Sequence, residues 1–425
     1  MPAIWTATAL FIAAYCLVFG SRLHRTFSAM VGAVAMVIVG REMGFYSPEA
    51  AIEYIDFETI ALLAGMMVHV ALLSETGCFR FLSIKTAKLT GGSPWKLAAT
   101  LALVTAFVSM IIDNVTTVVF IGPVTVLIAD VLRINPVPAL LAEAIMSNVG
   151  GVGTLVGDPP NIMIAHAAGL HFNDFLTHLF PVVLVVMIAC LFGLRLLFRR
   201  QMREKSQHLE TVRAMRERDA IRDMRALRLS LAGLGVTLAL FLLGEPLGIA
   251  PSVAAMAGAV VSLVLIRPDP DKVFREVDWT VLIFFASLFV LVGGLDGSGV
   301  LDKVAAWTSG FGRNHPGGAS VAVLWLGAVS SALIGNIPTA AALIPVVSRM
   351  GGLGIPVGPM WWALALGVGL GGNATPFGGA ANVVAISISE KTKHKITYGQ
   401  WMRIGLPVAL ISCLLATAAV LVLPW

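Results

Sequence analysis

Apolar segments that approach the length of a membrane-spanning helix recur along the whole chain of 425 residues. A transmembrane helix needs about 20 mostly apolar residues. In the first half such segments lie near residues 3–20, 27–40, 57–74, 97–130, 138–169 and 177–198. In the second half they lie near residues 229–244, 251–266, 279–295, 318–348, 357–390 and 402–424. This pattern predicts an all-α polytopic membrane protein.

The composition excludes the other broad classes of protein. Hydrophobic residues make up 57% of the chain and charged residues 12%, with a mean hydropathy of +0.88. Soluble domains carry about 25% charged residues, so a soluble enzyme is excluded. The four cysteines are far apart and form no CxxC pair, which argues against a disulfide framework. We expect no metal and no cofactor. The basic residues lie in short loops, a pattern that reports membrane orientation rather than binding to nucleic acid.

One hydrophilic segment separates two halves of similar sequence. Residues 199–228 contain ten Lys or Arg and five Asp or Glu, which predicts a basic, solvated linker between a first repeat at 1–198 and a second at 229–425. Landmarks of the two halves coincide at a shift of 222 or 221 residues, which predicts a duplicated and fused gene. They include Asn114 with Asn336, Thr117 with Thr339, Pro123 with Pro345, Thr154 with Thr375, and Asn161 with Asn382.

Two segments in each half interrupt the apolar runs. Polar residues at 112–117 and 335–339 predict the buried tips of re-entrant hairpins. Glycine and proline at 150–161 and 369–382 cannot continue a helix, and unwound backbone at membrane depth must line a cavity or be buried in protein. We therefore expect two inverted five-span repeats, with about ten transmembrane helices and two hairpins.

The distribution of basic residues predicts the orientation. Five crossings in each half place 25 of the 29 Lys and Arg residues on the linker's side of the membrane. By the positive-inside rule, the linker is cytoplasmic, and both termini face the periplasm or the cell exterior. We expect a protein of the bacterial inner membrane.

The polar residues at the four breaks predict a substrate site at the repeat interface. Broken helices that meet near the bilayer midplane are the binding architecture of secondary transporters, and released helix N-termini offer backbone N–H groups. Capping of the broken helices is an equally good interpretation of any single residue. The candidate binding residues are Asn114, Thr116, Thr117, Asn148, Thr154, Asn161, Asn336, Thr339, Asn373, Thr375 and Asn382.

Three carboxylates are candidates for proton coupling. Asp113 and Asp158 lie at breaks, and Glu143 lies in the apolar run before the second break. A carboxylate inside the bilayer is costly and marks function by default, and a low dielectric raises the pKa of a carboxyl group toward neutrality. A structural ion pair is the alternative, but we expect no basic side chain in the membrane beside these acids. Their repeat mates are Gly335, Gly379 and Leu364.

Three histidines follow the first break of the chain. His166, His171 and His178 could suggest a metal site, but their position predicts a solvated outer loop.

At these motifs the chain resembles the ion transporter superfamily, in the branch that contains arsenite efflux pumps (ArsB), sodium/proton antiporters (NhaD) and P proteins. The residues Asp113–Thr117 and Gly157–Asn161 resemble the P-protein side of that branch. The resemblance covers nearly the whole chain and implies an ArsB-type arsenical permease. It also implies an elevator motion, in which hairpins and broken helices move against a scaffold. Relatives are often homodimers, and docking of a cytoplasmic ATPase on the linker stays open.

Three transport functions fit these residues. The first is efflux of arsenite or antimonite in exchange for protons, because arsenite is an uncharged trihydroxide that amides and hydroxyls can bind. The second is Na⁺ or Li⁺ exchange for protons, with the aspartates as ligands. Transport of an organic anion such as a dicarboxylate is disfavoured, because two acids at the site would repel it. A channel is disfavoured by the mobile breaks.

Overall fold

The computed structural model describes residues 2–20, 23–91, 93–199, 210, 214–312, 317–352 and 355–423. Within these ranges the chain forms helices and loops and no β-strand. Residues 200–209 and 211–213 of the predicted linker at 199–228 lie outside the described residues. Six of the described helices are long and apolar enough to cross a membrane, and five shorter apolar helices accompany them. The prediction of an all-α polytopic membrane protein is thus confirmed.

The helices of the two halves follow the same order. Helices α4 and α15 begin at residues 57 and 279, and α7 and α18 begin at residues 114 and 336, so each pair starts 222 residues apart. The first half contains α1 (Pro2–Gly20), α2 (Arg25–Glu42), α3 (Pro48–Glu53), α4 (Phe57–Glu75), α5 (Cys78–Leu89), α6 (Pro94–Ser109), α7 (Asn114–Leu132), α8 (Val137–Gly151), α9 (Pro159–Ala168) and α10 (Phe172–Leu197). The second half contains η2 (Glu217–Ala220), α12 (Met224–Leu247), α13 (Pro251–Ile266), α14 (Pro270–Glu276), α15 (Trp279–Gly297), α16 (Val300–Gly312), α17 (Gly318–Ile334), α18 (Asn336–Gly352), α19 (Gly358–Gly371), η3 (Gly372–Ala374), α20 (Ala380–Glu390) and α21 (Tyr398–Val422).

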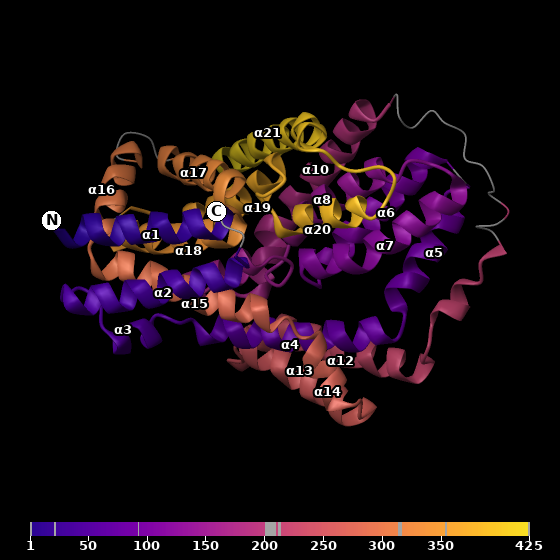
Figure 1. The fold of residues 1–425 in the computed structure, drawn as a ribbon, viewed down its shortest axis with the longest axis horizontal. Coiled ribbons are helices and arrows are strands. Elements are labelled where there is room, and N and C mark those ends of the chain that lie inside the picture. The colour runs from indigo at the N-terminus through magenta and orange to yellow at the C-terminus, as the bar shows by residue number, and fades with distance from the viewer. Residues whose placement is uncertain are drawn as a thin grey trace.

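The helices pack into two bundles (Figure 1). In bundle A, α2 packs against α1 and α15, and α13 packs against α4 and α12. Bundle B contains α6 to α10 and α17 to α21, with α6 against α8 and α17 against α19. The bundles meet where α9 contacts α4 and α18 contacts α15. Helices α5 and α16 connect bundle A to bundle B in the two halves.

Glycine permits the closest helix packing in bundle B. A Cβ atom on Gly150 of α8 would lie 2.2 Å from the carbonyl oxygen of Ala106 on α6. A Cβ atom on Gly371, at the end of α19, would lie 2.4 Å from the carbonyl oxygen of Ala328 on α17. Because these contacts are with backbone atoms, a larger residue cannot be accommodated by a side-chain rotation. The breaks therefore begin where α8 and α19 are pressed against their neighbours.

Aspartates cap the long helices at the centre of bundle A. Asp56 accepts a hydrogen bond from the backbone N–H of Thr59 at 3.0 Å, and Asp278 accepts one from Val281 at 3.2 Å. Such caps satisfy N–H groups that have no partner inside the helix. Helices α4 and α15 run in opposite directions, and in Figure 1 α3 lies toward the left end while α14 lies at the lower centre. Each cap therefore starts a bundle A helix that runs against the other.

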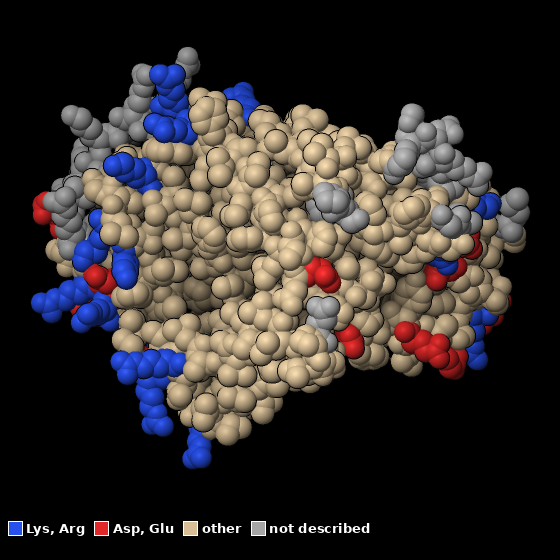
Figure 2. All heavy atoms as spheres, turned by 180° about the vertical axis from the view of Figure 1, so that it is seen from behind, with Lys and Arg blue, Asp and Glu red and all other residues tan. Residues whose placement is uncertain are grey.

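The charged side chains gather at the two ends of the molecule. Figure 2 shows most of the visible Lys and Arg at one end and several Asp and Glu toward the other, with a broad, almost uncharged surface between them. An uncharged belt is what a bilayer's hydrocarbon core requires. At the basic end, Lys88 of α5 donates a hydrogen bond to Glu217 of η2 at 2.7 Å. The end of the linker is thereby fixed to the helix that connects the bundles.

Candidate functional site

The first-half hairpin tip is built by a capping aspartate. Asp113 precedes α7 and accepts hydrogen bonds from the backbone N–H of Thr116 at 2.9 Å and from its hydroxyl at 2.5 Å. The Thr116 side chain is thus engaged by the cap. Thr117 donates to the carbonyl of Asp113 at 2.9 Å, and Thr339 makes the equivalent bond to the carbonyl of Gly335 at 2.8 Å. These threonines stabilise the tips through backbone groups.

Asp158 is the point where the two halves converge. It directly precedes α9 and is almost completely buried, with 1% of its surface exposed. Its carboxylate accepts hydrogen bonds from the side-chain amide of Asn114 at 3.2 Å and from that of Asn336 at 3.1 and 3.2 Å. Both donors are neutral amides, and each is the first residue of a helix that follows a hairpin tip. An acid of the first half is therefore held by both halves of the chain.

Asn148 of α8 links this carboxylate to the second broken helix. Its side-chain amide donates to the side-chain oxygens of Asn373 and Asn382, each at 2.8 Å. Its own oxygen accepts from Asn114 at 3.3 Å. We call the set of Asn114, Asn148, Asn336, Asn373 and Asn382 the amide cluster. All five asparagines are buried, so the cluster forms a continuous polar network inside bundle B.

The remaining candidate residues at the breaks hold unwound backbone. Asn161 donates to the carbonyls of Gly151, Val152 and Thr154, and Asn382 donates to those of Gly372 and Thr375, all within 3.3 Å. The hydroxyl of Thr154 donates to the carbonyl of Met110, and the hydroxyl of Thr375 donates to that of Ala332. For Thr154, Asn161 and Thr375 the structure thus places capping contacts where the sequence left capping and binding open.

The two halves differ at two matching positions whose residues lie where the halves meet. Where the first half has Asn148 and Asp158, the second has Gly369 and Gly379. A Cβ atom on Gly379 would lie 2.8 Å from the Asn148 amide nitrogen, and one on Gly369 would lie 3.7 Å from an Asp158 oxygen. Side chains of the first half thus fill the space beside glycines of the second. The result is one buried carboxylate between two similar sets of helices.

Two small cavities border this site. One, of about 80 Å³, is lined by both Asp113 and Asp158 and by Asn114 and Asn336. The other, of about 200 Å³, is lined by the second hairpin tip, including Asn336. Both lie between the hairpin tips and bundle A.

Arg25 is a residue of this site that the sequence did not reveal. It begins α2 and lines both cavities, and its guanidinium carbon lies 5.8 Å from the centre of the Phe284 ring. Among the described residues that line these cavities it is the one basic side chain. The 80 Å³ cavity also contains Glu276 and Asp278, so it holds four carboxylates and one guanidinium. Arg25 follows a loop in the sequence, and its approach to the site depends on the packing of α2 against α15.

Glu143 lies apart from the amide cluster. It is fully buried on α8, and one of its oxygens accepts a hydrogen bond from the hydroxyl of Thr125 on α7 at 2.6 Å. Among the described residues, no hydrogen-bond partner reaches its other, buried oxygen. Glu143 is also absent from the described residues that line the two small cavities. The structure therefore brings Asp113 and Asp158 to one cavity and separates Glu143 from it.

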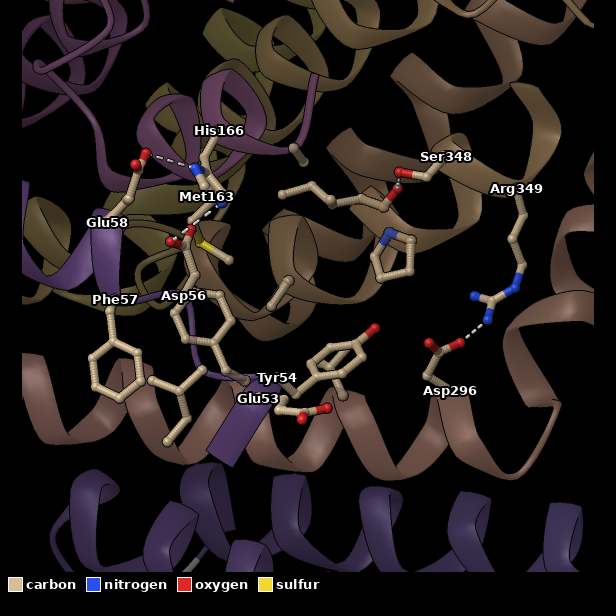
Figure 3. A pocket seen from close by; sticks show the side chains of 17 residues that line it. Glu53, Tyr54, Asp56, Phe57, Glu58, Met163, His166, Asp296, Ser348 and Arg349 are labelled. Atoms are coloured by element: carbon tan, nitrogen blue, oxygen red, sulfur yellow. Dashed lines mark hydrogen bonds and ion pairs between the residues drawn. The ribbon is translucent and has the colours of Figure 1, made fainter. Parts of the chain in front are cut away.

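A larger cavity of about 680 Å³ lies at the opposite end of the interface between the bundles. Its walls come from the start of α4, from α15 and from the far ends of α9 and α18 (Figure 3). His166 lines it from α9, although the sequence predicted a loop there. The helix continues to Ala168 and ends only at Gly169, whose φ of +65° is left-handed. The larger cavity is therefore separated from Asp158 by about two turns of α9.

The sequence is similar to a known protein family and to several known membrane proteins. The family model described as "Citrate transporter" (CitMHS) matches residues 14–367. The 46 kDa membrane protein of Mycobacterium leprae is 39% identical over 96% of both chains. The P protein of Homo sapiens is 31% identical over 98% of this chain and 59% of its own length. The resemblance to P proteins that the motifs indicate is confirmed.

Solved structures of two transporters share the fold. The YdaH transporter of Alcanivorax borkumensis superposes with a TM-score of 0.55 and 16% identity over 97% of both chains. MtrF of Neisseria gonorrhoeae, whose structure is described as illuminating a class of antimetabolite efflux pumps, superposes with a TM-score of 0.65 and 12% identity over 99% of this chain and 96% of its own.

Proposed function

The chain belongs to the CitMHS citrate transporter family, and on that premise we propose that it is a secondary transporter that exchanges a small solute for protons. The family consists of membrane transporters and not of enzymes. In our proposal Asp158 binds and releases the coupling proton, and the amide cluster binds the solute. Glu143 is a second group that can carry a proton, at a separate place in bundle B.

The observation that carries this proposal is the environment of Asp158. The carboxylate is buried, and its two hydrogen-bond donors are the neutral amides of Asn114 and Asn336. A buried carboxylate that is stabilised by a basic side chain would stay ionised. With neutral donors, the charge can instead be cancelled by a proton or by a bound cation. Asp158 is therefore suited to alternate between two states.

Transport in this proposal follows the division into two bundles. Bundle B carries the hairpin tips, the broken helices and the amide cluster, and it moves against bundle A as an elevator. The small cavities beside Asp113 and the larger cavity beside Asp56 lie at opposite ends of the bundle interface. Movement of bundle B along that interface would expose Asp158 to each end in turn.

Arsenite or antimonite is the substrate that we favour. Near neutral pH arsenite is an uncharged trihydroxide, and its hydroxyl groups can donate to and accept from carboxamides. The amide cluster supplies such groups without a net charge of its own. Efflux would then follow from protonation of Asp158 on one side of the membrane and release on the other.

Exchange of Na⁺ or Li⁺ for protons is a second candidate, favoured by the acidity of the small cavity. Asp113, Asp158, Glu276 and Asp278 line it together with Arg25. Carboxylate and amide oxygens are hard ligands that suit such cations. A dicarboxylate or tricarboxylate is disfavoured by the same four acids, because like charges repel in a poorly solvated cavity.

Proton flux in proteoliposomes tests these alternatives. The purified chain is reconstituted, a pH gradient is imposed, and arsenite, antimonite, Na⁺, Li⁺ and citrate are added in turn. Collapse of the gradient with the metalloids supports the favoured function, and collapse with Na⁺ or Li⁺ alone supports the second. Collapse with citrate alone would contradict both.

The proposed function also requires a location and an orientation in the membrane. We infer that the protein lies in the inner membrane with the linker in the cytoplasm and both termini on the opposite side. The cytoplasmic end would then be the one that carries α5, α14 and most of the visible basic residues in Figure 2.

A further inference from the structure

A histidine on bundle B bridges two carboxylates on bundle A. The Nδ1 atom of His166 on α9 lies 2.9 Å from Oε2 of Glu58, which belongs to the first turn of α4. Its Nε2 atom lies 3.7 Å from Oδ1 of Asp56, the cap of the same helix. Figure 3 shows the imidazole between the two acids at the edge of the larger cavity. The contact therefore joins the two bundles directly.

The charged groups around His166 come from several elements. From bundle A, Glu53 and Asp296 line the same cavity, and from α18 so does Arg349. Arg349 forms ion pairs with Asp296 of α15 and Asp302 of α16. His171 lines a neighbouring cavity on the other side of His166. Helix α19, which also packs on α9, contributes no titratable side chain.

Two bridges of different chemistry thus line the larger cavity. The guanidinium of an arginine stays charged at every physiological pH. An imidazole changes its charge in the physiological range. Of the two basic partners, imidazole is therefore the one whose attraction to a carboxylate a proton can change.

We propose that His166, Glu58 and Asp56 form a proton-dependent latch that holds bundle B against bundle A in the present arrangement. In this arrangement Asp158 lines the small cavity at the other end of the interface. Protonated His166 attracts both carboxylates, so the latch is closed at acidic pH. Neutral His166 loses that attraction, so the latch opens as the pH rises. Acidification at the end that carries the larger cavity would thus slow the movement of bundle B.

The latch rests on the proposed function only for its effect on transport, because the contact itself exists without a substrate. Hydrogen–deuterium exchange of the purified full chain therefore tests it directly. Exchange is measured at pH 5.5 and pH 8.0 and corrected for the intrinsic pH dependence of amide exchange. Residues 54–60 and 159–169 report on the two sides of the bridge.

We expect these segments of the wild-type protein to exchange about two- to five-fold more slowly at pH 5.5, the effect of an exposed ion pair. In His166→Gln and in Glu58→Gln the two pH values should give equal exchange. His394→Gln changes an exposed histidine in the loop between α20 and α21 and should behave as wild type. A pH effect that persists in both latch variants, or that is absent from the wild type, would overturn the latch.

Transport assays separate this proposal from the proposed function. If solute exchange with protons occurs, acidification on the side of the larger cavity should slow it in the wild type and not in His166→Gln. If amide exchange of the two segments depends on pH but no transport occurs, the latch is supported and the proposed function is contradicted. Transport whose pH profile and amide exchange are unaltered in His166→Gln would contradict the latch and leave the proposed function intact.

Discussion

Asn114 and Asn336 lie 222 residues apart in the chain and donate their side-chain amides to the same carboxylate, that of Asp158, at 3.2 and 3.1 Å. Each begins a helix directly after a hairpin tip. Residues at matching positions of the two halves thus hold one acid, where the second half has Gly379 at the matching position. Replacing Asn114, Asn336 or Asp158 should therefore alter contacts that both halves make at the site.

Replacing the buried acid should abolish coupling without unfolding the protein. Asp158→Asn keeps the size of the side chain and removes its ability to bind a proton, so we expect loss of proton-coupled flux in proteoliposomes. Elution as a single species in detergent would show that the fold is intact. Asp219→Asn, an exposed aspartate of η2, is the matched control and should transport normally. Normal pH-dependent transport by folded Asp158→Asn would refute the assignment.

Asn336 and Asn382 both belong to the amide cluster, but Asn382 should contribute more to stability. Asn336→Ala removes a donor from Asp158, and we expect KM to rise about tenfold, the equivalent of one buried hydrogen bond of about 1.4 kcal/mol. Asn382→Ala leaves the carbonyls of Gly372 and Thr375 without their donor. It should lower the free energy of unfolding by about 1–3 kcal/mol. Substrate kinetics and thermal unfolding distinguish the two effects, and equal losses in both assays for both variants would contradict this division.

The packing of the breaks can be tested with alanine at glycine positions. Gly369→Ala would place a Cβ atom 2.1 Å from a methyl group of Val152, and the added Val152→Ala change removes that methyl group. We expect the single change to destabilise the protein by about 1–3 kcal/mol and the pair to restore most of the loss.

Gly150→Ala meets backbone instead, so no such rescue is expected. Gly193→Ala in α10 has no atom within 4 Å of the new Cβ and is the neutral control. Thermal unfolding in detergent measures all four variants. A Gly369→Ala protein as stable as the wild type would show that the breaks inside bundle B do not pack as described.

The contact between the linker's end and α5 should weaken at acidic pH. The hydrogen bond from Lys88 holds the pKa of Glu217 below its ordinary value, so this contact is fully present above the ordinary pKa of about 4.3. It is lost as the pH falls through the lowered pKa. Corrected amide exchange of residues 214–222 should rise over that range in the wild type.

Lys88→Met should show fast exchange in this segment at every pH. Lys85→Met on the same helix should resemble the wild type, because Lys85 lies over the ring of Phe81. Unchanged protection in Lys88→Met would mean that this contact does not hold the segment.

The sequence predicted the helical spans, the tips and the breaks better than the contacts between them. Gly and Pro at the breaks, and the common offset of the two halves, were sufficient to expect polar tips at 112–117 and 335–339 and a break that contains Asp158. An offset states which residues are equivalent but not which way a side chain points in an unwound segment. The sequence left capping and binding open for Asn161, whose contacts are local, whereas the contact of Thr154 with Met110 and the approach of Arg25 to the site depend on packing between distant helices. His166 was placed in a loop because α9 is short and its continuation to Gly169 leaves little trace in composition.

The glycines opposite Asn148 and Asp158 have a consequence for the direction of transport. If the chain is the proposed exchanger, the acid keeps the same two amide donors whichever end of the molecule is open. The donors themselves then give no preference for forward or backward operation. Net flow then follows the concentrations that the cell maintains on either side, and reversing those concentrations would turn an exporter into an importer.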